Sequence, residues 1–406
     1  MMHWAVPLSD LVVEDDDLRA VTDTYRSGWL SMGPRTRQFE DLFARFVGTR
    51  HAVAVTNGTA ALHLMCLAVG LTTGDEVIVP SLTFVATANA VRYTGATPVF
   101  ADIAGLARPW LSAASCEQVI TSRTKAVLYV AYGGHAGEIG ALRDLCARRG
   151  LILLEDAAHA AGSWWHGRHL GTFGTAGAFS MFANKNLAVG EGGVVVTADP
   201  DIADRVRLLR SHGMTTLTWD RHQGHAHTYD VVALGYNYRI DEPRATLAAC
   251  RLRRLAAENQ RRARLDARYR EALGDLDVMI PGHPVDAVPG QPVDDGCARS
   301  HHLFAVVLPA DVDRDAFRGH LSERGVQTSV HYPPVHRSTV HAAPPGSPRR
   351  ELPLTDRYAA RTVTLPMFAH MRDDQQEQVV SATGKALALA RTSSRRRDTG
   401  DETAAR

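Results

Sequence analysis

The sequence predicts an α/β fold, in which a large, mostly parallel and doubly wound sheet domain is followed by a smaller α/β domain. Before Asp241, short apolar runs of strand length alternate with segments of helical spacing, a pattern typical of buried parallel strands joined by helices. At Asp241 the composition changes to an Arg-, Ala- and Leu-rich stretch with helical spacing. The chain of 406 residues is long enough for two domains.

These patterns predict the elements in order. In the large domain we expect strands at 51–55, 76–79, 96–101, 126–132 and 151–154, and helices at 59–69, 83–93 and 139–149. A long connecting helix over 242–273, a Pro- and Gly-rich link over 282–292 and small-domain strands at 302–308, 328–331 and 362–365 follow. We therefore expect a large domain at 1–245, whose N-terminal segment is free to pack on the small domain, and the connecting helix with the small domain at 246–391. The tail 392–406 is polar without an apolar face, which predicts disorder.

Composition excludes several classes of protein. The formal net charge is +1, so no overall field attracts nucleic acid or an anionic membrane. The N-terminal segment has an acidic run at 14–17 where a signal peptide would be basic, and charges interrupt every apolar stretch before it reaches membrane-spanning length. The five cysteines lie far apart without a CxxC pair, as expected of reduced thiols in a cytoplasmic protein.

One lysine is a candidate nucleophile. Only three of the 45 basic residues are lysines, namely Lys125, Lys185 and Lys385. Lys185 follows the apolar segment 179–182 and precedes a glycine-rich turn at 190–193. A lysine in a desolvated pocket loses part of its proton affinity and becomes nucleophilic. An exposed surface lysine is the alternative, but Arg supplies nearly all basic charge elsewhere, which favours the functional interpretation.

Two further motifs lie where a strand meets the following segment. Gly58 and Thr59 place backbone N–H groups at a helix N-terminus, where the dipole favours an anion such as phosphate; a structural helix cap is equally compatible. Asp156 and His159 follow an apolar strand at the sheet edge where ligands bind. A carboxylate there can hold a protonated pyridine nitrogen, although an Asp at a strand end also commonly caps a helix.

Together and in their order along the chain, the three motifs resemble the DegT/DnrJ/EryC1/StrS family of sugar aminotransferases. The resemblance extends over residues 28–366, with further similar segments at 28–34 (GWLSMGP), 80–87 (PSLTFVAT), 234–239 (LGYNYR) and 330–336 (VHYPPVH). It implies the fold type I architecture of aspartate aminotransferase and the cofactor pyridoxal 5′-phosphate (PLP), or its amine form PMP. It also implies transfer of an amino group from L-glutamate or L-glutamine to a keto-sugar.

The resemblance implies roles for individual residues. Lys185 would form the Schiff base and carry the proton, Asp156 would pair with the pyridinium nitrogen, and His159 would lie near the phenolic oxygen. The remaining cofactor contacts would be Phe84 on the ring, and Gly58, Thr59 and Ser180 on the phosphate together with Asn237 of the partner subunit. That last contact implies a homodimer with shared active sites. The expected substrate contacts are Trp29, Arg239, His331 and Tyr332.

The chain departs from the family pattern at three positions. His159 stands where many members carry Gln, and Ala131 and Glu138 replace a His and an Asp that are frequent in the family. These positions lie near the expected cofactor edge, so the departures bear on the acceptor rather than on the cofactor.

Several alternatives stay open. The acceptor is a keto-sugar, nucleotide-linked or not, or a keto-cyclitol, and the pathway is secondary-metabolite or cell-surface sugar biosynthesis. Sugar dehydratases of the family carry His in place of the Schiff-base lysine, so Lys185 favours transamination. Intact Lys185 and Asp156 argue against a non-catalytic relative. The histidines at 212, 222, 225 and 227 could hold a metal, but their polar surroundings suit a loop at the substrate entrance at least as well, and no metal site is predicted.

Overall fold

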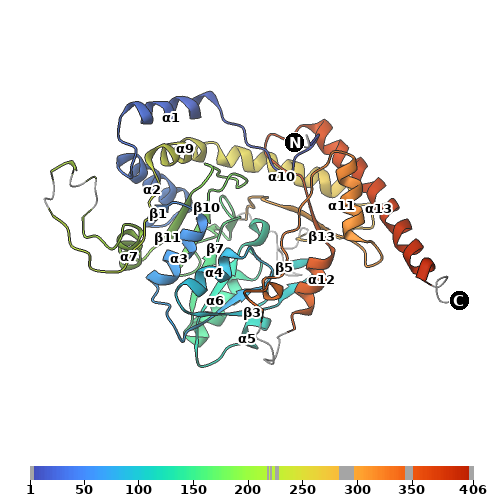
Figure 1. Ribbon diagram of the computed structural model, residues 1–406, viewed down its shortest axis with the longest axis horizontal. Coiled ribbons are helices and arrows are strands. Elements are labelled where there is room, and N and C mark those ends of the chain that lie inside the picture. The colour runs from blue at the N-terminus through green and yellow to red at the C-terminus, as the bar shows by residue number, and fades with distance from the viewer. Residues whose placement is uncertain are drawn as a thin grey trace.

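The computed structural model describes residues 4–216, 219, 222–224, 228–282, 297–342 and 351–401, with side chains described as far as Arg391. A central sheet and its covering helices form the large domain, and a smaller group of helices and strands forms the C-terminal part (Figure 1). No helix among these residues is both long and apolar enough to cross a bilayer.

The central sheet explains the apolar runs of the sequence. Within the described residues it has the strand order β1-β11-β10-β7-β6-β2-β3. The strands are β1 (His51–Val55), β2 (Glu76–Pro80), β3 (Thr97–Ala101), β6 (Thr124–Val130), β7 (Ile152–Asp156), β10 (Ala176–Ser180) and β11 (Gly193–Thr197). Strands β10, β7, β6, β2 and β3 are parallel, and β11 runs antiparallel to both of its neighbours. The mostly parallel sheet is therefore confirmed, and its strands are apolar along their length because helices cover both faces.

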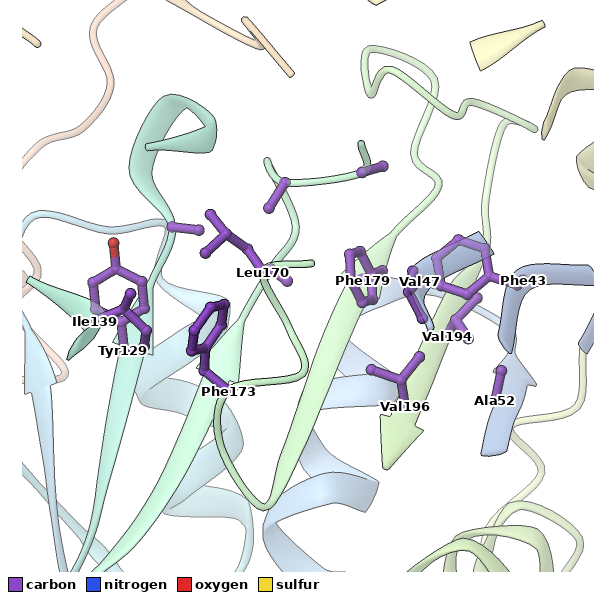
Figure 2. Close-up of a cluster of buried hydrophobic side chains, with 14 of the residues drawn as sticks. Phe43, Val47, Ala52, Tyr129, Ile139, Leu170, Phe173, Phe179, Val194 and Val196 are labelled. Atoms are coloured by element: carbon purple, nitrogen blue, oxygen red, sulfur yellow. The ribbon is translucent and has the colours of Figure 1, made fainter. Parts of the chain in front are cut away.

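Two layers of helices bury the two faces. One face packs on α2 (Pro34–Val47), α6 (Ile139–Arg149) and α9 (Glu242–Leu252); the other packs on α3 (Gly58–Ala68), α4 (Ala86–Tyr93) and α7 (Pro200–Arg210). Figure 2 shows the first layer, where Phe43 and Val47 of α2 meet Phe179 and Val194 of the sheet. Fully buried aromatic side chains here make the sheet a rigid platform for residues at its edge.

Smaller elements complete the large domain. They are α1 (Asp15–Arg26), α5 (Ala113–Glu117) and the short strands β4 (Ile103–Gly105), β5 (Arg108–Leu111), β8 (Trp164–Trp165) and β9 (Arg168–His169).

The predicted single helix over 242–273 is wrong, because the structure divides it into α9 and α10 (Leu255–Ala272). The break falls at Arg254, whose guanidinium bonds Asp17 of α1 and Glu258 of α10. Helix α9 packs against α1 and α2, whereas α10 contacts the C-terminal helix α13. The two halves thus face different cores, and the core of the large domain extends past residue 245 to Leu255.

The small domain has its own core. This core is built from α10, β12 (Phe304–Val307), α11 (Arg314–Glu323), β13 (Thr362–Leu365) and α13 (Asp373–Asp401). The remaining helix, α12 (Pro353–Arg361), buries Tyr358 in a separate cluster with Ile103 and Tyr132 of the large domain. The N-terminal segment joins the core of the small domain, because Val6 pairs with Val326 and is fully buried in this core. Figure 1 shows the N-terminus beside α11 and α13, although these helices lie near the other end of the sequence.

Three other expectations concern the strand at 328–331, the link at 282–292 and the tail at 392–406. The strand expected at 328–331 is reduced to a single bridge between Ser329 and Thr364; Pro333 and Pro334, which lack N–H groups, follow shortly after it and turn the chain toward the cavity described below. The link at 282–292 falls, after Gly282, outside the described residues. Helix α13 continues to Asp401, but side chains beyond 391 are not described, so the disordered tail at 392–406 stays a prediction.

Candidate active site

A cavity of about 1070 Å³ opens at the C-terminal ends of the parallel strands. Strands β7 and β10 and the N-terminus of α3 contribute to one wall, and residues 329–338 of the small domain form the other. Most of the residues proposed from sequence line this cavity, namely Gly58, Thr59, Phe84, Asp156, His159, Ser180, Lys185, His331 and Tyr332. The fold therefore gathers four segments of the large domain and one of the small domain around a single space.

Lys185 lies in the connection between β10 and β11, at the end of a tight turn in which its backbone N–H donates to Phe182 O at 2.8 Å. The residue is partly accessible from the cavity, but protein surrounds its amine. Burial lowers the pKa of Lys185 to about 8, although the Asp156 carboxylate acts in the opposite direction. A large fraction of this amine is therefore unprotonated under mildly alkaline conditions, as a nucleophile requires.

Asp156 is the last residue of β7 and is almost fully buried. Its Oδ2 accepts a hydrogen bond from Thr87 Oγ1 at 2.7 Å, and its Oδ1 accepts one from the Ala158 N–H at 3.1 Å. Burial raises the pKa of Asp156, and these two donors together with Lys185 oppose the rise. A buried carboxylate at a cavity wall has an unmet need for a cationic partner.

His159 is held from two sides. Its Nδ1 accepts a hydrogen bond from the Gly133 N–H at 3.3 Å, and its Nε2 lies 2.9 Å from the Tyr332 hydroxyl. Its ring centroid is 4.2 Å from that of His302. Burial, reinforced by the charge of Lys185 and by His331, lowers the pKa of His159 well below its usual value, so the ring is neutral.

A cradle for an anion is present where α3 meets the sheet. The first N–H groups of a helix have no partner within it; that of Ala60 bonds the Asn57 cap at 2.8 Å, which leaves those of Gly58 and Thr59 for a ligand. Gly58 approaches β10 so closely that a Cβ there would lie 2.8 Å from the Ser180 Cβ. The glycine thus brings the helix N-terminus against the Ser180 hydroxyl, an arrangement that suits a phosphate.

Phe84 lies at the cavity with 58% of its side chain exposed. Its ring centroid is 6.0 Å from that of Tyr332. An aromatic face left open beside a cavity is available to stack on a planar ligand.

Three predicted site residues do not line this cavity. Asn237 is exposed on the surface. Trp29 packs against Trp219 and His222, with its ring centroid 4.7 Å from each. Arg239 is half-buried, and burial lowers its pKa together with the charge of Arg210. Their roles stay predictions.

Sequence reasoning missed residues that support the site. Thr87 orients the Asp156 carboxylate, and Thr83 in turn lies 2.7 Å from the Thr87 hydroxyl; two threonines at i and i+4 near a helix start were the available signal. His302 gave no local signal, because it reaches the site only through folding. Tyr238, which lines the cavity, lies in the segment 234–239 that resembles the family, but no role was assigned to it.

The histidines at 212–227 form no recognisable metal site in the part of the chain that the structure describes, where no group of three or more metal-ligating side chains occurs. His225 and His227 lie outside that part. His222 stacks on Trp29 instead.

Comparisons with known proteins agree with this geometry. The model of the DegT/DnrJ/EryC1/StrS aminotransferase family matches residues 12–383. The chain belongs to this family.

Individual relatives cover almost the whole chain. The spore coat polysaccharide biosynthesis protein SpsC of Bacillus subtilis is 38% identical over 382 residues, which is 93% of this chain and 96% of SpsC. The crystal structure of the aminotransferase TlmJ from Streptoalloteichus hindustanus is 33% identical with a TM-score of 0.85, covering 95% of this chain and 99% of TlmJ. That of DesV from S. venezuelae is 36% identical with a TM-score of 0.82, covering 94% and 98%.

The protein is thus a PLP-dependent aminotransferase of the sugar aminotransferase family, with the fold type I architecture. Its cavity fits the cofactor on four independent points. The amine of Lys185 has a lowered pKa, Asp156 is a buried carboxylate lacking a full counter-charge, the N-terminus of α3 offers free N–H groups beside Ser180, and Phe84 presents an open ring. These match the aldehyde carbon, the pyridine nitrogen, the phosphate and the ring of PLP, respectively.

Proposed function

We propose that this enzyme transfers an amino group from L-glutamate or L-glutamine to a keto-sugar linked to a nucleotide. The observation that carries the proposal is Lys185, a nucleophilic amine at a cavity of about 1070 Å³. That volume reaches the upper end of ordinary small-molecule sites and leaves room for a second ligand beside the cofactor.

Each group of the chain has a defined task in this proposal. PLP supplies an electron sink for the bond that is broken. Asp156 would keep the pyridine nitrogen protonated, and the N-terminus of α3 with Ser180 would hold the phosphate. Lys185 would act as the general acid–base that moves a proton at the reacting carbon of the donor and, in the second half-reaction, of the acceptor. The buried walls around Asp156 and His159 exclude water from this transfer.

The shape of the cavity supports a large acceptor. The wall from the small domain ends at Arg337 and Ser338, and the Arg337 side chain is 55% exposed, so a substituent on the sugar can extend past this cation. The structure of DesI in the presence of its TDP-sugar product is 32% identical to this chain, with a TM-score of 0.83 and coverage of 98% of this chain and 96% of that one. The name of SpsC, a spore coat polysaccharide biosynthesis protein, supports a role in cell-surface sugar biosynthesis; secondary-metabolite biosynthesis is the alternative.

A homodimer with shared sites is part of the proposal. Large apolar side chains are exposed in two groups, one at the cavity mouth and one in the segment before Asn237; they are Phe84, Tyr93, Phe182, Val231, Val232 and Leu234. Leu234 alone is 86% exposed. Exposed apolar patches mark interaction surfaces, and a partner covering both groups would bring its own Asn237 toward the cradle. The free cysteines suit the reducing cytoplasm.

A half-reaction assay tests the substrates. The PLP form is mixed with L-glutamate or L-glutamine, and the change in cofactor absorption is followed until the PMP form is complete. Keto acceptors, both nucleotide-linked sugars and free cyclitols, are then screened for restoring the PLP spectrum. Restoration by a nucleotide-linked keto-sugar is expected; restoration by a keto-cyclitol alone would replace this acceptor. Lys185→Ala serves as the control that lacks both half-reactions.

A further inference from the structure

The environment of His159 determines its tautomer. The Gly133 N–H donates to Nδ1, so Nδ1 carries no hydrogen. The ring is neutral, and its one N–H must therefore be at Nε2. That hydrogen is directed at the Tyr332 oxygen, 2.9 Å away. Both nitrogens of His159 are engaged by protein groups.

The Tyr332 hydroxyl is left with an unused hydrogen. It accepts from His159, and within the described residues His159 is its only hydrogen-bond partner. The ring lines the cavity together with Phe84, Asp156 and Lys185. A phenol O–H that lines a cavity without an acceptor is available to a ligand.

The cofactor's outline identifies the acceptor of this hydrogen. With the pyridine nitrogen at Asp156 and the aldehyde carbon at Lys185, the phosphate lies on one edge of the ring and the phenolic oxygen on the other. Gly58, Thr59 and Ser180 form the cradle proposed for the phosphate, and His159 and Tyr332 line the same cavity outside this cradle. The phenolic oxygen is therefore expected on the side of His159 and Tyr332.

We propose that Tyr332 donates a hydrogen bond to the phenolic oxygen of the bound cofactor, and that His159 acts as a positioning residue which holds the Tyr332 hydroxyl. The proposal rests on the proposed function only for the placement of the ring between Asp156 and Lys185. It differs from the role implied by family resemblance, in which His159 itself lies against this oxygen.

The hydrogen bond has a measurable consequence. The hydrogen bond from Tyr332 stabilises the ionised phenolic oxygen. It therefore lowers the affinity for the proton that this oxygen would share with the Lys185 nitrogen. Removal of the hydroxyl in Tyr332→Phe is expected to raise the pKa at which the bound cofactor's absorption band changes, by about one unit, or tenfold in proton affinity. The titration is done without substrate and needs no turnover.

Tyr269→Phe is the matched control. The Tyr269 hydroxyl is also buried but donates to Pro366 O at 2.9 Å in the small domain. This variant loses a phenol hydroxyl of the same kind and should keep the wild-type spectral pKa. An unchanged pKa in Tyr332→Phe, with only KM for the acceptor raised, would assign Tyr332 to the substrate and overturn the proposal.

A double-mutant cycle tests the positioning role. The titratable groups around the pair are Asp156, Lys185, His302, His331 and Tyr132, and all remain in each variant. If His159 acts through Tyr332, His159→Ala shifts the spectral pKa in the same direction and the double variant shows no further shift. Additive shifts would show that His159 contacts the cofactor on its own.

The tautomer can be checked without cofactor. In ¹⁵N-histidine spectra of the cofactor-free protein, assigned with His159→Ala, the signals of His159 should be those of the Nε2–H form. An Nδ1–H form would overturn the argument. Failure of the proposed acceptor would leave the spectral titrations and the ¹⁵N-histidine spectra unaffected, because neither measurement uses the acceptor.

Discussion

At the scale of single residues, the chemistry of this enzyme depends on two buried groups of opposite charge. Lys185 and Asp156 lie at the same cavity, and burial moves the pKa of each toward its neutral form. Each partly offsets the shift of the other by its charge. In the proposed complex the cofactor would replace this mutual interaction, with its aldehyde carbon at the lysine and its ring nitrogen at the carboxylate.

The lowered pKa of Lys185 predicts its reactivity. In the cofactor-free protein an amine-directed acylating reagent should modify Lys185 with a rate that rises with pH and reaches half its maximum near pH 8, because only the unprotonated amine reacts. In Asp156→Asn the midpoint should move lower, since the carboxylate favours the charged ammonium. Mass spectrometry measures modification at each pH, with exposed Lys125 as an internal reference. A midpoint near the ordinary lysine value would contradict the burial seen here.

The raised pKa of Asp156 predicts that its ionised carboxylate lowers the stability of the cofactor-free protein. Because burial makes the carboxylate bind its proton more tightly in the folded state, its charge destabilises the folded protein, and this cost grows as pH rises through the folded-state pKa. Cofactor-free Asp156→Asn should therefore melt no lower than wild type at neutral pH, and the difference should vanish in acid.

A second variant, Thr87→Val, and the addition of PLP test the same prediction. Thr87→Val removes a donor that stabilises the Asp156 charge, so it should melt lower than wild type at neutral pH. Added PLP should raise the Tm of wild type more than that of Asp156→Asn. A lower Tm of cofactor-free Asp156→Asn at neutral pH would contradict the prediction.

At the scale of elements, the junction of α3 with β10 and β11 builds the phosphate cradle. A Cβ on Gly193 would lie 2.4 Å from Asn57 O, and one on Gly58 would lie 2.8 Å from the Ser180 Cβ. The absence of side chains at both positions lets the helix N-terminus reach the sheet.

Gly58→Ala should therefore push α3 away from β10. We expect weaker cofactor binding by about 1–3 kcal/mol, the usual cost of overpacking a tight contact, as measured by titrating cofactor-free protein with PLP. Gly319→Ala is the matched control, since Gly319 lies in helix α11 with open space around it; there alanine should leave cofactor binding unchanged and raise stability by about 0.5–1 kcal/mol. Equal effects of the two changes would argue against the close approach.

At the scale of the whole molecule, the site is open where a second subunit is proposed to cover it. Phe84 and Phe182 at the mouth and Leu234 near Asn237 are exposed. Their burial in a dimer would exclude water and add Asn237 of the partner subunit to the phosphate cradle.

Subunit complementation tests the shared site. Homodimers of Lys185→Ala and of Asn237→Asp should each be strongly impaired. Co-expressed in equal amounts, they should recover about a quarter of wild-type activity, because half of the dimers are mixed and each mixed dimer has one intact site of two. No recovery in mixed dimers isolated by two different tags would show that each subunit uses its own Asn237.

The order of strands and helices was readable from sequence because it depends on local patterns. The strand at 51–55 and the helix at 139–149 agree with β1 and α6, since apolar periodicity reports directly on burial. The helix over 242–273 was wrong at Arg254, because the break there depends on an ion pair with Asp17, which lies 237 residues away in sequence.

The residues of the candidate site also fall into those that could be identified from the sequence and those that could not. Lys185, Asp156 and the glycine cradle could be named from the sequence, because each motif is short and has a chemical signature of its own. The pairing of His159 with Tyr332 could not, since the two residues are 173 positions apart and meet only after both domains have packed. The sequence alone thus determined which chemical groups the chain offers, and the tertiary structure decided which of them line the cavity, because hydrogen-bond geometry and burial arise only between segments brought together by folding.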